Sequence, residues 1–585
     1  MMASADESAG TIEITVTSAL AGLVDAYEQM PMPMNRYLGV ILVPSAVFFV
    51  GTVAAAVFLD VALMIRGPIP LLGFLMLASA VFYPKILLSQ RKSELNNQFH
   101  LVVTHMTVLA TTNIDRIEVF RQLSKQDQYG EMAAEIGRVV ELVDTWNLSL
   151  DDACRRRAKQ VPSDAVSDFF DRLGYTLGAG QALDDYLVSE QDQIIANYKT
   201  VYQGTLDNLE VMKDLYLSMI LSMTFALVFA VVLPVLTGTN PTVTVSAVIV
   251  LYVFVQSGFY LAIRSMAPHD PLWYHPEDKP SPIESKIRNA TVAGTALSGG
   301  LLAFSLVGMF GISPVTLDDV VFFLDPLPLP FYAAIPTLPL LIPGLVVGAE
   351  EKRIKARDGE FPSFIRALGA TEGAKQSTTS TVLESLRKKD FGPLTDDVDN
   401  LYKRLNMRIE TTQAWRHFTA ECRSSLIQKF SEMYLIGREM GGDPKLLGEL
   451  ISENMMEVQQ LRQRRSQATT TLIGLLYGIT AASTFAFFIG LQVVNILASM
   501  TLDLDSSSSS FDASTLINTA SYNIPLIEFL LVVIIMFGAM LSALMVRTVD
   551  GGHKINTYVH FVALTWIGSI TGVMTKWLVT QFLAI

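Results

Sequence analysis

Two stretches of the sequence share one pattern: GYTLGAGQALDDYL at 174–187 and GREMGGDPKLLGEL at 437–450. Each places glycines between two segments with helical apolar spacing. Glycine adopts the left-handed conformation that ends many helices, and Asp443 followed by Pro444 is typical of the start of a helix. The pattern therefore predicts a helix, a tight turn and a second helix in both places. The glycines assigned to these turns are Gly174, Gly178, Gly180, Gly437, Gly441 and Gly442.

A glycine-rich stretch can also form a phosphate-binding loop. That loop requires a preceding strand, and a dinucleotide site requires an acidic residue about 20 positions further on in a βαβ unit. The sequence offers neither. The nearest approach to a nucleotide motif, GATEGAK at 369–375, has short glycine spacing and no Ser or Thr after its lysine. We interpret the glycines as structural and expect any energy to come from a partner.

Half of the 585 residues are hydrophobic and the mean hydropathy is +0.38, which indicates a membrane protein with large polar parts. Apolar runs of roughly 20 residues can cross about 30 Å of hydrocarbon. Nine such runs are found. The predicted membrane helices are 38–59, 69–88, 216–236, 243–263, 290–310, 331–348, 469–497, 526–546 and 558–582.

A shift of 263 positions aligns the two halves of the chain. It pairs Lys125 with Lys388 and Gly178 with Gly441, and it places the second apolar run on the sixth. The polar regions of both halves have helical patterning, so we expect an all-α fold with two duplicated helical domains. The predicted order is a segment (1–37), two membrane helices (38–88), a domain (89–215), two membrane helices (216–264), a loop (265–289), two membrane helices (290–349), a domain (350–468) and three membrane helices (469–585).

Basic residues predict the orientation. Arg91 and Lys92 follow the second run, and further basic residues flank the second polar region, so both domains are expected in the cytoplasm. The segments expected outside, 60–68, 237–242, 311–330 and 498–525, contain one basic residue, Arg66. The chain is thus predicted to lie in the cell membrane with its N-terminus cytoplasmic and its C-terminus outside.

The remaining composition argues against a catalytic, cofactor or metal site. Cys154 and Cys422 lie in separate polar regions without a zinc or disulfide pattern, and we expect them to be packing residues. His100 and His105 are five positions apart, which does not place them on one helix face. The chain is therefore predicted not to be an enzyme. Its formal net charge of -13 is unusual for a membrane protein and suggests an organism whose proteins are generally acidic, such as a halophile.

A duplicated helical domain that ends in G-x-x-x-G-x-x-x-x-L-x-x-x-L, with each copy set between membrane helices, resembles the type II secretion F family. These are platform proteins of type IV pilus-like machines. Two domains, about nine spans and an acidic composition are most similar to the archaellum platforms, and adhesive-pilus platforms are close relatives. The resemblance implies a hexameric cytoplasmic secretion ATPase, archaellin or pilin subunits and other archaellum motor components as partners. A homodimer is compatible with the sequence, and no nucleic acid partner is expected.

Three basic clusters are candidates for docking the ATPase through electrostatic steering. Their alternative role is to set topology or to form solvated faces, and for the third, close to the bilayer, to contact membrane lipid. The clusters are Arg155, Arg156, Arg157 and Lys159; Lys388 and Lys389; and Arg462, Arg464 and Arg465.

The predicted function is a non-enzymatic membrane platform that converts motion of the ATPase into extraction and stacking of pilin-like subunits. Two alternatives stay open: a secondary transporter built from parallel repeats, and a receptor for a soluble regulator. Transporters place ionisable groups near the membrane midplane, and Glu528 and Lys576 are almost the only charges at depth.

Overall fold

The computed structural model describes residues 27, 33–58, 68–112, 114–268, 270–276, 282–309, 317, 327–375, 379–506 and 522–583. Among these residues the regular structure is helical apart from an isolated β-bridge between Trp273 and Ser424. The prediction of an all-α fold is confirmed. The chain divides into two compact units, Met1–Ile194 and Ile195–Ile585.

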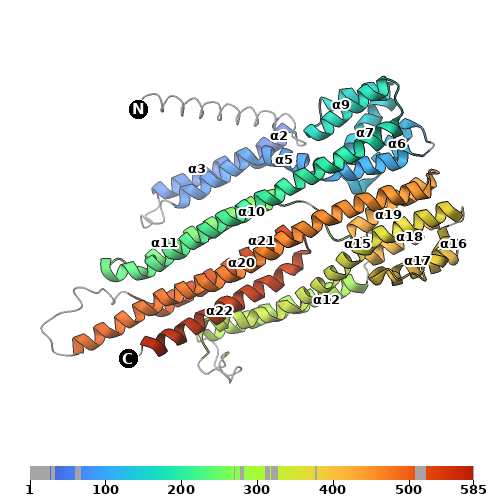
Figure 1. Cartoon of the computed structure of the whole chain (residues 1–585). Coiled ribbons are helices and arrows are strands. Elements are labelled where there is room, and N and C mark those ends of the chain that lie inside the picture. Colours follow the sequence, from blue (N-terminus) through green and yellow to red (C-terminus); the bar gives the residue numbers. More distant parts are fainter. Residues whose placement is uncertain are drawn as a thin grey trace. The chain divides into compact units, whose positions relative to one another are not determined.

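In the first unit, α3 packs against α5, and a helical domain forms from the C-terminal part of α5 onward (Figure 1). Its core contains fully buried Phe120, Tyr129, Phe169 and Phe170. The elements are α2 (Met34–Tyr37), η1 (Leu38–Leu42), α3 (Val43–Phe58), α5 (Pro68–Ala110), α6 (Arg116–Ser124), η2 (Asp127–Tyr129), α7 (Glu131–Asp144), α8 (Leu150–Ala158), α9 (Asp164–Gly178) and the start of α10 (Leu183–Thr237).

In the second unit, α20 packs along α15, α21 and α22, and α11 packs on α21 (Figure 1). The elements after α10 are α11 (Pro241–Met266), α12 (Pro282–Met309), α14 (Leu329–Ala334), η3 (Ile335–Leu340), α15 (Leu341–Lys375), α16 (Thr379–Leu386), η4 (Gly392–Leu394), α17 (Thr395–Asn406), α18 (Thr411–Cys422), α19 (Ser425–Glu439), α20 (Pro444–Ser506), α21 (Ile524–Asp550), η6 (Lys554–Asn556) and α22 (Thr557–Leu583).

Eight helices of the described part are long and apolar enough to cross a membrane, and each overlaps a different one of the nine predicted spans. The remaining span, 69–88, begins α5, and several of its side chains lie outside the described residues. The sixth predicted span is not one regular helix, because η3 interrupts it. Pro336 and Pro339 lie in η3, where the missing N–H groups favour a tight turn over an α-helix.

The predicted boundaries between membrane helices and domains fall inside continuous helices. Residues 88/89 lie within α5, 215/216 within α10, 349/350 within α15 and 468/469 within α20. At these places the helix surface changes from apolar on all sides to apolar on one face only. The backbone hydrogen bonds of a helix do not depend on that change, so the helix continues. Each helical domain is therefore joined by unbroken helix to the predicted span at either end.

The same order of short helices, α6–α9 and α16–α19, occurs in both domains. The first helices begin at Arg116 and Thr379, 263 positions apart. The capping residues Ser163 of α9 and Ser424 of α19 are 261 positions apart. The second copy is thus two residues shorter in the middle, and the prediction that one shift of 263 serves the whole domain is wrong.

The turn between α9 and α10 is a Schellman motif centred on Gly180. This glycine has a φ of 84°. Its N–H donates to the carbonyl of Leu177 at 3.0 Å, and the N–H of Gln181 donates to the carbonyl of Thr176 at 3.2 Å. These two bonds satisfy carbonyls that the end of the helix leaves unpaired.

The same motif ends α19. Gly441 has a φ of 86°, and its N–H donates to the carbonyl of Arg438 at 3.1 Å. The N–H of Gly442 donates to the carbonyl of Gly437 at 2.9 Å. The carboxylate of Asp443 then accepts two backbone N–H groups of the first turn of α20, at 2.8 and 3.2 Å. The predicted helix, turn and N-cap are confirmed here.

Gly174 and Gly178 are not part of the turn, because both lie within α9, and Gly437 likewise lies within α19 and contributes only its carbonyl to the second turn. The assignment of Gly174 and Gly178 to the turn is wrong, and Gly180 occupies its left-handed position. Gly174 has a packing role: a Cβ there would lie 2.8 Å from the carbonyl oxygen of Asp151 and 2.6 Å from Cγ of Arg155. Its lack of a side chain lets α8 and α9 approach closely.

The turn assignment predicts that Gly180→Ala and Gly441→Ala each lower the free energy of unfolding by about 1 kcal/mol, because a Cβ is strained in the left-handed conformation. Gly178→Ala is the matched control. It should be neutral or stabilising, since alanine is favoured over glycine within a helix by up to about 1 kcal/mol. Thermal unfolding in detergent micelles measures all three. An equal decrease in the free energy of unfolding for all three variants would contradict the turn assignment.

His105 of α5 is fully buried in the first domain, and its Nδ1 lies 2.9 Å from the hydroxyl of Tyr129. Burial lowers the pKa of His105 to about 3 from an ordinary value of 6.5. Below pH 6.5 the unfolded chain binds a proton at this position that the folded chain does not bind. The histidine therefore makes the domain less stable as the pH falls from 6.5 towards 3.

His105→Gln, which cannot titrate, should flatten this dependence. Between pH 6 and 4, wild type should lose up to about 1.4 kcal/mol per pH unit relative to the variant. The check is thermal unfolding of both proteins as a function of pH. Exposed His417→Gln is the control and should follow wild type. Parallel profiles for wild type and His105→Gln would show that His105 is not buried in its neutral form.

Candidate functional site

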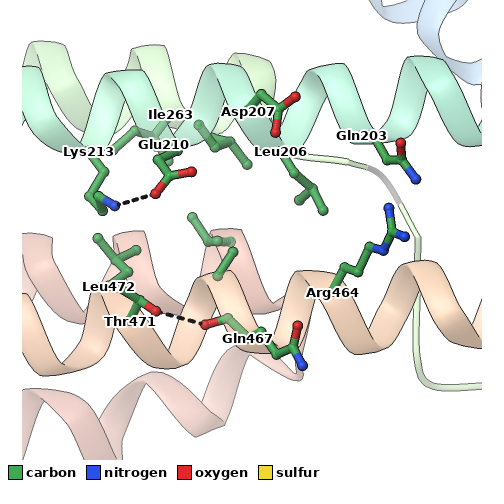
Figure 2. A pocket seen from close by; sticks show the side chains of 13 residues that line it. Gln203, Leu206, Asp207, Glu210, Lys213, Ile263, Arg464, Gln467, Thr471 and Leu472 are labelled. Carbon is green, nitrogen blue, oxygen red and sulfur yellow. Dashed lines mark hydrogen bonds and ion pairs between the residues drawn. The ribbon is translucent and has the colours of Figure 1, made fainter.

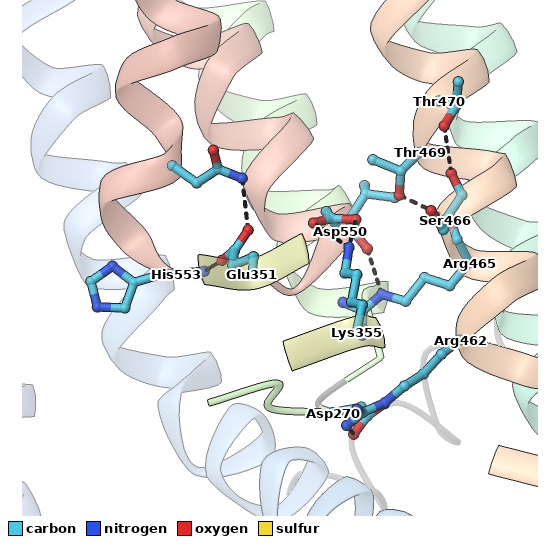
Figure 3. Close-up of polar contacts among 12 residues, drawn as sticks. Asp270, Glu351, Lys355, Arg462, Arg465, Ser466, Thr469, Thr470, Asp550 and His553 are labelled. Atoms are coloured by element: carbon cyan, nitrogen blue, oxygen red, sulfur yellow. Dashed lines mark hydrogen bonds and ion pairs between the residues drawn. The ribbon is translucent and has the colours of Figure 1, made fainter. Parts of the chain in front are cut away.

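A cluster of charged residues joins four segments of the second unit: the loop after α11, α15, α20 and the turn between α21 and α22 (Figure 3). At its centre, Arg462 of α20 donates from Nε and Nη2 to the two carboxylate oxygens of Asp270, both at 2.6 Å. Its Nη1 donates to Asp358 of α15 at 3.0 Å, and Nη2 also reaches the carbonyl of Pro271 at 3.1 Å. A guanidinium that binds one carboxylate through two bonds is held in a fixed orientation. We refer to Arg462, Asp270 and Asp358 as the clamp.

The clamp is largely buried. The Arg462 side chain is 16% exposed and that of Asp358 is 6% exposed. Burial alone would raise the pKa of Asp270, but the charge and hydrogen bonds of Arg462, with smaller contributions from Arg465 and Lys429, leave the pKa below its ordinary value. Asp270 is therefore ionised at neutral pH. Removing the arginine would leave two carboxylates in a poorly solvated place.

Arg465, one helical turn further along α20, holds the end of α21. The residue is 4% exposed, and its guanidinium donates to the carbonyls of Val549 at 2.5 Å and Thr548 at 3.3 Å. These carbonyls belong to the last turn of α21, where a cation also interacts favourably with the helix dipole. Gly551, with a φ of 74°, follows α21, and a Cβ there would lie 2.6 Å from the guanidinium.

Glu351 of α15 connects the same segments on the other side of the cluster. Its carboxylate accepts the backbone N–H of His553 at 2.5 Å and the side-chain amide of Asn556 at 3.0 Å. It also accepts the indole N–H of Trp273 at 3.1 Å. One carboxylate thus binds α15 to both the loop after α11 and the turn before α22.

The loop after α11 also pairs with the second helical domain. The N–H of Ser425 donates to the carbonyl of Leu272 at 3.1 Å, and the N–H of Tyr274 donates to the carbonyl of Arg423 at 2.8 Å. The hydroxyl of Ser424, between these two, accepts N–H groups at the start of α19. Displacement of the second domain would therefore pull on this loop, and through it on the clamp.

A cavity of about 260 Å³ lies beside the clamp and includes Lys355 and Asp550, which are 3.4 Å apart. Its lining contains acidic and basic side chains in similar numbers. Within the described ranges, no group of three or more His, Cys, Asp or Glu residues is placed to hold a metal ion. The arrangement holds the loop after α11, α15, α20 and the turn before α22 together.

The structure changes the interpretation of the third basic cluster. Arg462 and Arg465 are engaged inside the molecule, so the prediction that they form an exposed docking surface is wrong. Arg464 is exposed and lines a second cavity, of about 360 Å³, between α10, α11, α20 and α21. Figure 2 shows its guanidinium directed towards Gln203 of α10, with Lys213 further along that helix. The sequence around these arginines does not show which of them are buried and which is exposed, because the carboxylate partner of Arg462 lies 192 positions away.

The first basic cluster also divides. Arg157 is an internal residue, because its Nε donates to the fully buried carboxylate of Glu135 at 2.6 Å. Arg155 is paired with acidic residues of its own helix, at 2.7 and 3.2 Å. Arg156 and Lys159 are exposed and make no ion pair with any described residue.

The second basic cluster, at the end of α16, is exposed in full. The ammonium of Lys389 lies 5.3 Å from the ring centroid of Phe391, and Lys388 is its neighbour in the chain. The sequence-predicted docking residues that remain exposed and free of ion pairs among the described residues are Arg156, Lys159, Lys388, Lys389 and Arg464.

Comparison with known proteins places the chain beside a secretion family and two archaeal relatives. The family model for the type II secretion system (T2SS), protein F matches residues 102–232, which contain most of the first helical domain and part of α10. The chain is 34% identical over 520 residues to flagella accessory protein J of Methanocaldococcus jannaschii, with 88% of this chain and 90% of the relative covered. It is 28% identical over 513 residues to flagella accessory protein J of Methanococcus voltae, with the same coverage. No solved structure matches the chain.

The clamp predicts a large difference between two neighbouring arginines. Arg462→Met should lower the free energy of unfolding by about 3 kcal/mol or more, because it leaves Asp270 and Asp358 without their counter-charge. Arg464→Met, the matched control on the same helix, should stay within about 0.5 kcal/mol of wild type, because Arg464 is exposed. Thermal unfolding in detergent compares the two. A stable Arg462→Met protein would contradict the clamp.

Proposed function

The chain belongs to the flagella accessory protein J family, and from this premise we propose that it is the membrane platform on which an archaellum, a type IV pilus-like filament, is assembled. Three observations support the proposal: the curated relatives are flagella accessory proteins, a secretion system protein F domain is present, and the chain is a multi-pass membrane protein. The name of the relatives favours an archaellum over an adhesive pilus.

On this proposal the two helical domains face the cytoplasm, where a hexameric secretion ATPase engages them. The N-terminus is cytoplasmic and the C-terminus is outside. The platform has no catalytic site of its own, and the ATPase supplies the energy. Archaellin subunits and other archaellum motor components are the further partners, and exposed Arg156, Lys159, Lys388 and Lys389 are the candidate docking cations.

The observation that carries the proposed coupling is the continuity of α15 and α20. Both helices run without a break from the second domain into the membrane bundle, and the clamp fixes them to each other and to the loop after α11. A helix that keeps its backbone hydrogen bonds is a stiff element. Displacement of the domain by the ATPase would therefore move membrane helices, and so act on a subunit at the base of the filament.

Deletion of the gene tests the proposed function. The deletion strain should lack archaella and swimming motility, and the wild-type gene should restore both. Electron microscopy of cells and a swimming assay provide the readout. Unchanged filaments and motility in the deletion strain would contradict the platform function.

A second complementation tests coupling through α20. Glu453 is an exposed residue in the part of α20 that belongs to the second domain and precedes the predicted span. Glu453→Pro should break the stiff connection, since proline removes a helical hydrogen bond and bends the helix. We expect that variant to be present in the membrane and to bind the ATPase but to leave cells without filaments. Glu453→Ala is the control and should assemble filaments as wild type does. Normal filament numbers with Glu453→Pro would rule out coupling through an unbroken α20.

A further inference from the structure

Each helical domain exposes one large apolar side chain at the corner before its third short α-helix. In the first domain Trp146, between α7 and α8, is 64% exposed. In the second domain Met407, between α17 and α18, is 66% exposed. The two residues are 261 positions apart, the same separation as the capping residues Ser163 and Ser424. They therefore occupy equivalent positions in the two copies of the fold.

The backbone of the two corners is also equivalent. The residue after each apolar side chain has the left-handed backbone conformation although it is not a glycine. Asn147 has a φ of 51° and Arg408 a φ of 59°. An arginine in this conformation is disfavoured. At the second corner the N–H of Arg408 donates to the carbonyl of Leu405 at 3.0 Å, and the N–H of Ile409 donates to the carbonyl of Arg404 at 3.2 Å. Both domains thus keep one corner geometry with different residues.

The corner does not need its exposed apolar residue in order to close. In this type of helix end, the residue after the left-handed one packs back on the helix. Leu148 and Ile409 occupy that place and are half-buried. Trp146 and Met407 come before the left-handed residue and remain in solvent. Their exposure in both copies has no explanation in the packing of the domains.

Each exposed side chain has an unpaired cation beside it. The guanidinium of Arg156 lies 6.0 Å from the ring centroid of Trp146, and Arg408 follows Met407 in the chain. Both arginines are exposed, and neither forms an ion pair with a described residue. Trp, Met and Arg are enriched in protein–protein interfaces, and Trp and Arg supply many of the residues that dominate binding. Such a corner fits an apolar notch with an acidic rim on a protein partner.

We propose that Trp146 and Met407 are paired anchors for the secretion ATPase, an inference that rests on the proposed function. A ring of identical subunits presents the same notch several times, so one kind of site can receive both corners. This explains why the two domains keep the same exposed corner although most of their surface residues differ. The arginines add attraction to the acidic rim, and the apolar side chains supply the buried contact.

The test uses the full chain in lipid nanodiscs and the purified ATPase hexamer from the same organism, with Kd measured by biolayer interferometry. Trp146→Ala and Met407→Ala should each raise Kd at least tenfold, and the double variant should raise it further. Trp146→Phe should bind nearly as wild type does. Val188→Ala is the matched control: Val188 is 47% exposed, but its counterpart 261 positions on is Glu449, so no equivalent apolar residue exists. Its Kd should not change.

The outcomes separate this inference from the proposed function. If wild type binds the ATPase and both alanine variants bind equally well, the anchors are overturned and the platform function stands. A loss at one corner alone would overturn the pairing. Unchanged ATPase affinity with weakened binding to protein-free liposomes would identify the corners as membrane contacts and overturn the inference. Absence of any wild-type binding to the ATPase would overturn the proposed coupling, and with it the anchors.

Discussion

The contact of one arginine with two carboxylates is the constraint on which the second unit depends. Arg462 comes from a helix of the second domain that continues into the membrane, Asp358 from the neighbouring helix and Asp270 from the loop after α11. None of the three can move far without exposing an unpaired charge in a poorly solvated place. The clamp therefore makes the domain and the membrane helices to which it is joined a single mechanical element.

The first domain is held to its incoming helix by the same kind of interaction. Glu135 of α7 is fully buried and is paired with Arg91 of α5 at 2.9 Å and with Arg157 of α8 at 2.6 Å. In the second domain, Arg357 of α15 is paired with Asp397 of α17 at 2.9 Å. In both copies an arginine on the helix that enters from the membrane meets a buried carboxylate of the domain. The duplication thus extends from the helix order to the way in which each domain is fastened.

The features that sequence predicts well here are local ones. The membrane helices follow from the length of apolar runs, and the turn at Gly441 follows from the glycines and Asp443 beside it. The features that the sequence does not reveal depend on contacts between distant parts of the chain or on small differences in length between the two copies. In the sequence Arg462 is a candidate docking cation, but in the structure the loop that contains Asp270 covers it and pairs with it. Because the second copy is two residues shorter, Gly441 corresponds to Gly180 and not to Gly178, and a single shift of 263 positions pairs the wrong glycines.

The central claim is that the second domain and the membrane helices of the second unit move as one body. Spin labels at Lys388→Cys and Lys554→Cys, both exposed, would measure it by double electron–electron resonance, since the native cysteines are buried. The distance should have a narrow distribution that does not change when the ATPase binds and hydrolyses ATP. A broad distribution, or one that shifts during hydrolysis, would show a hinge between domain and membrane and would contradict the account.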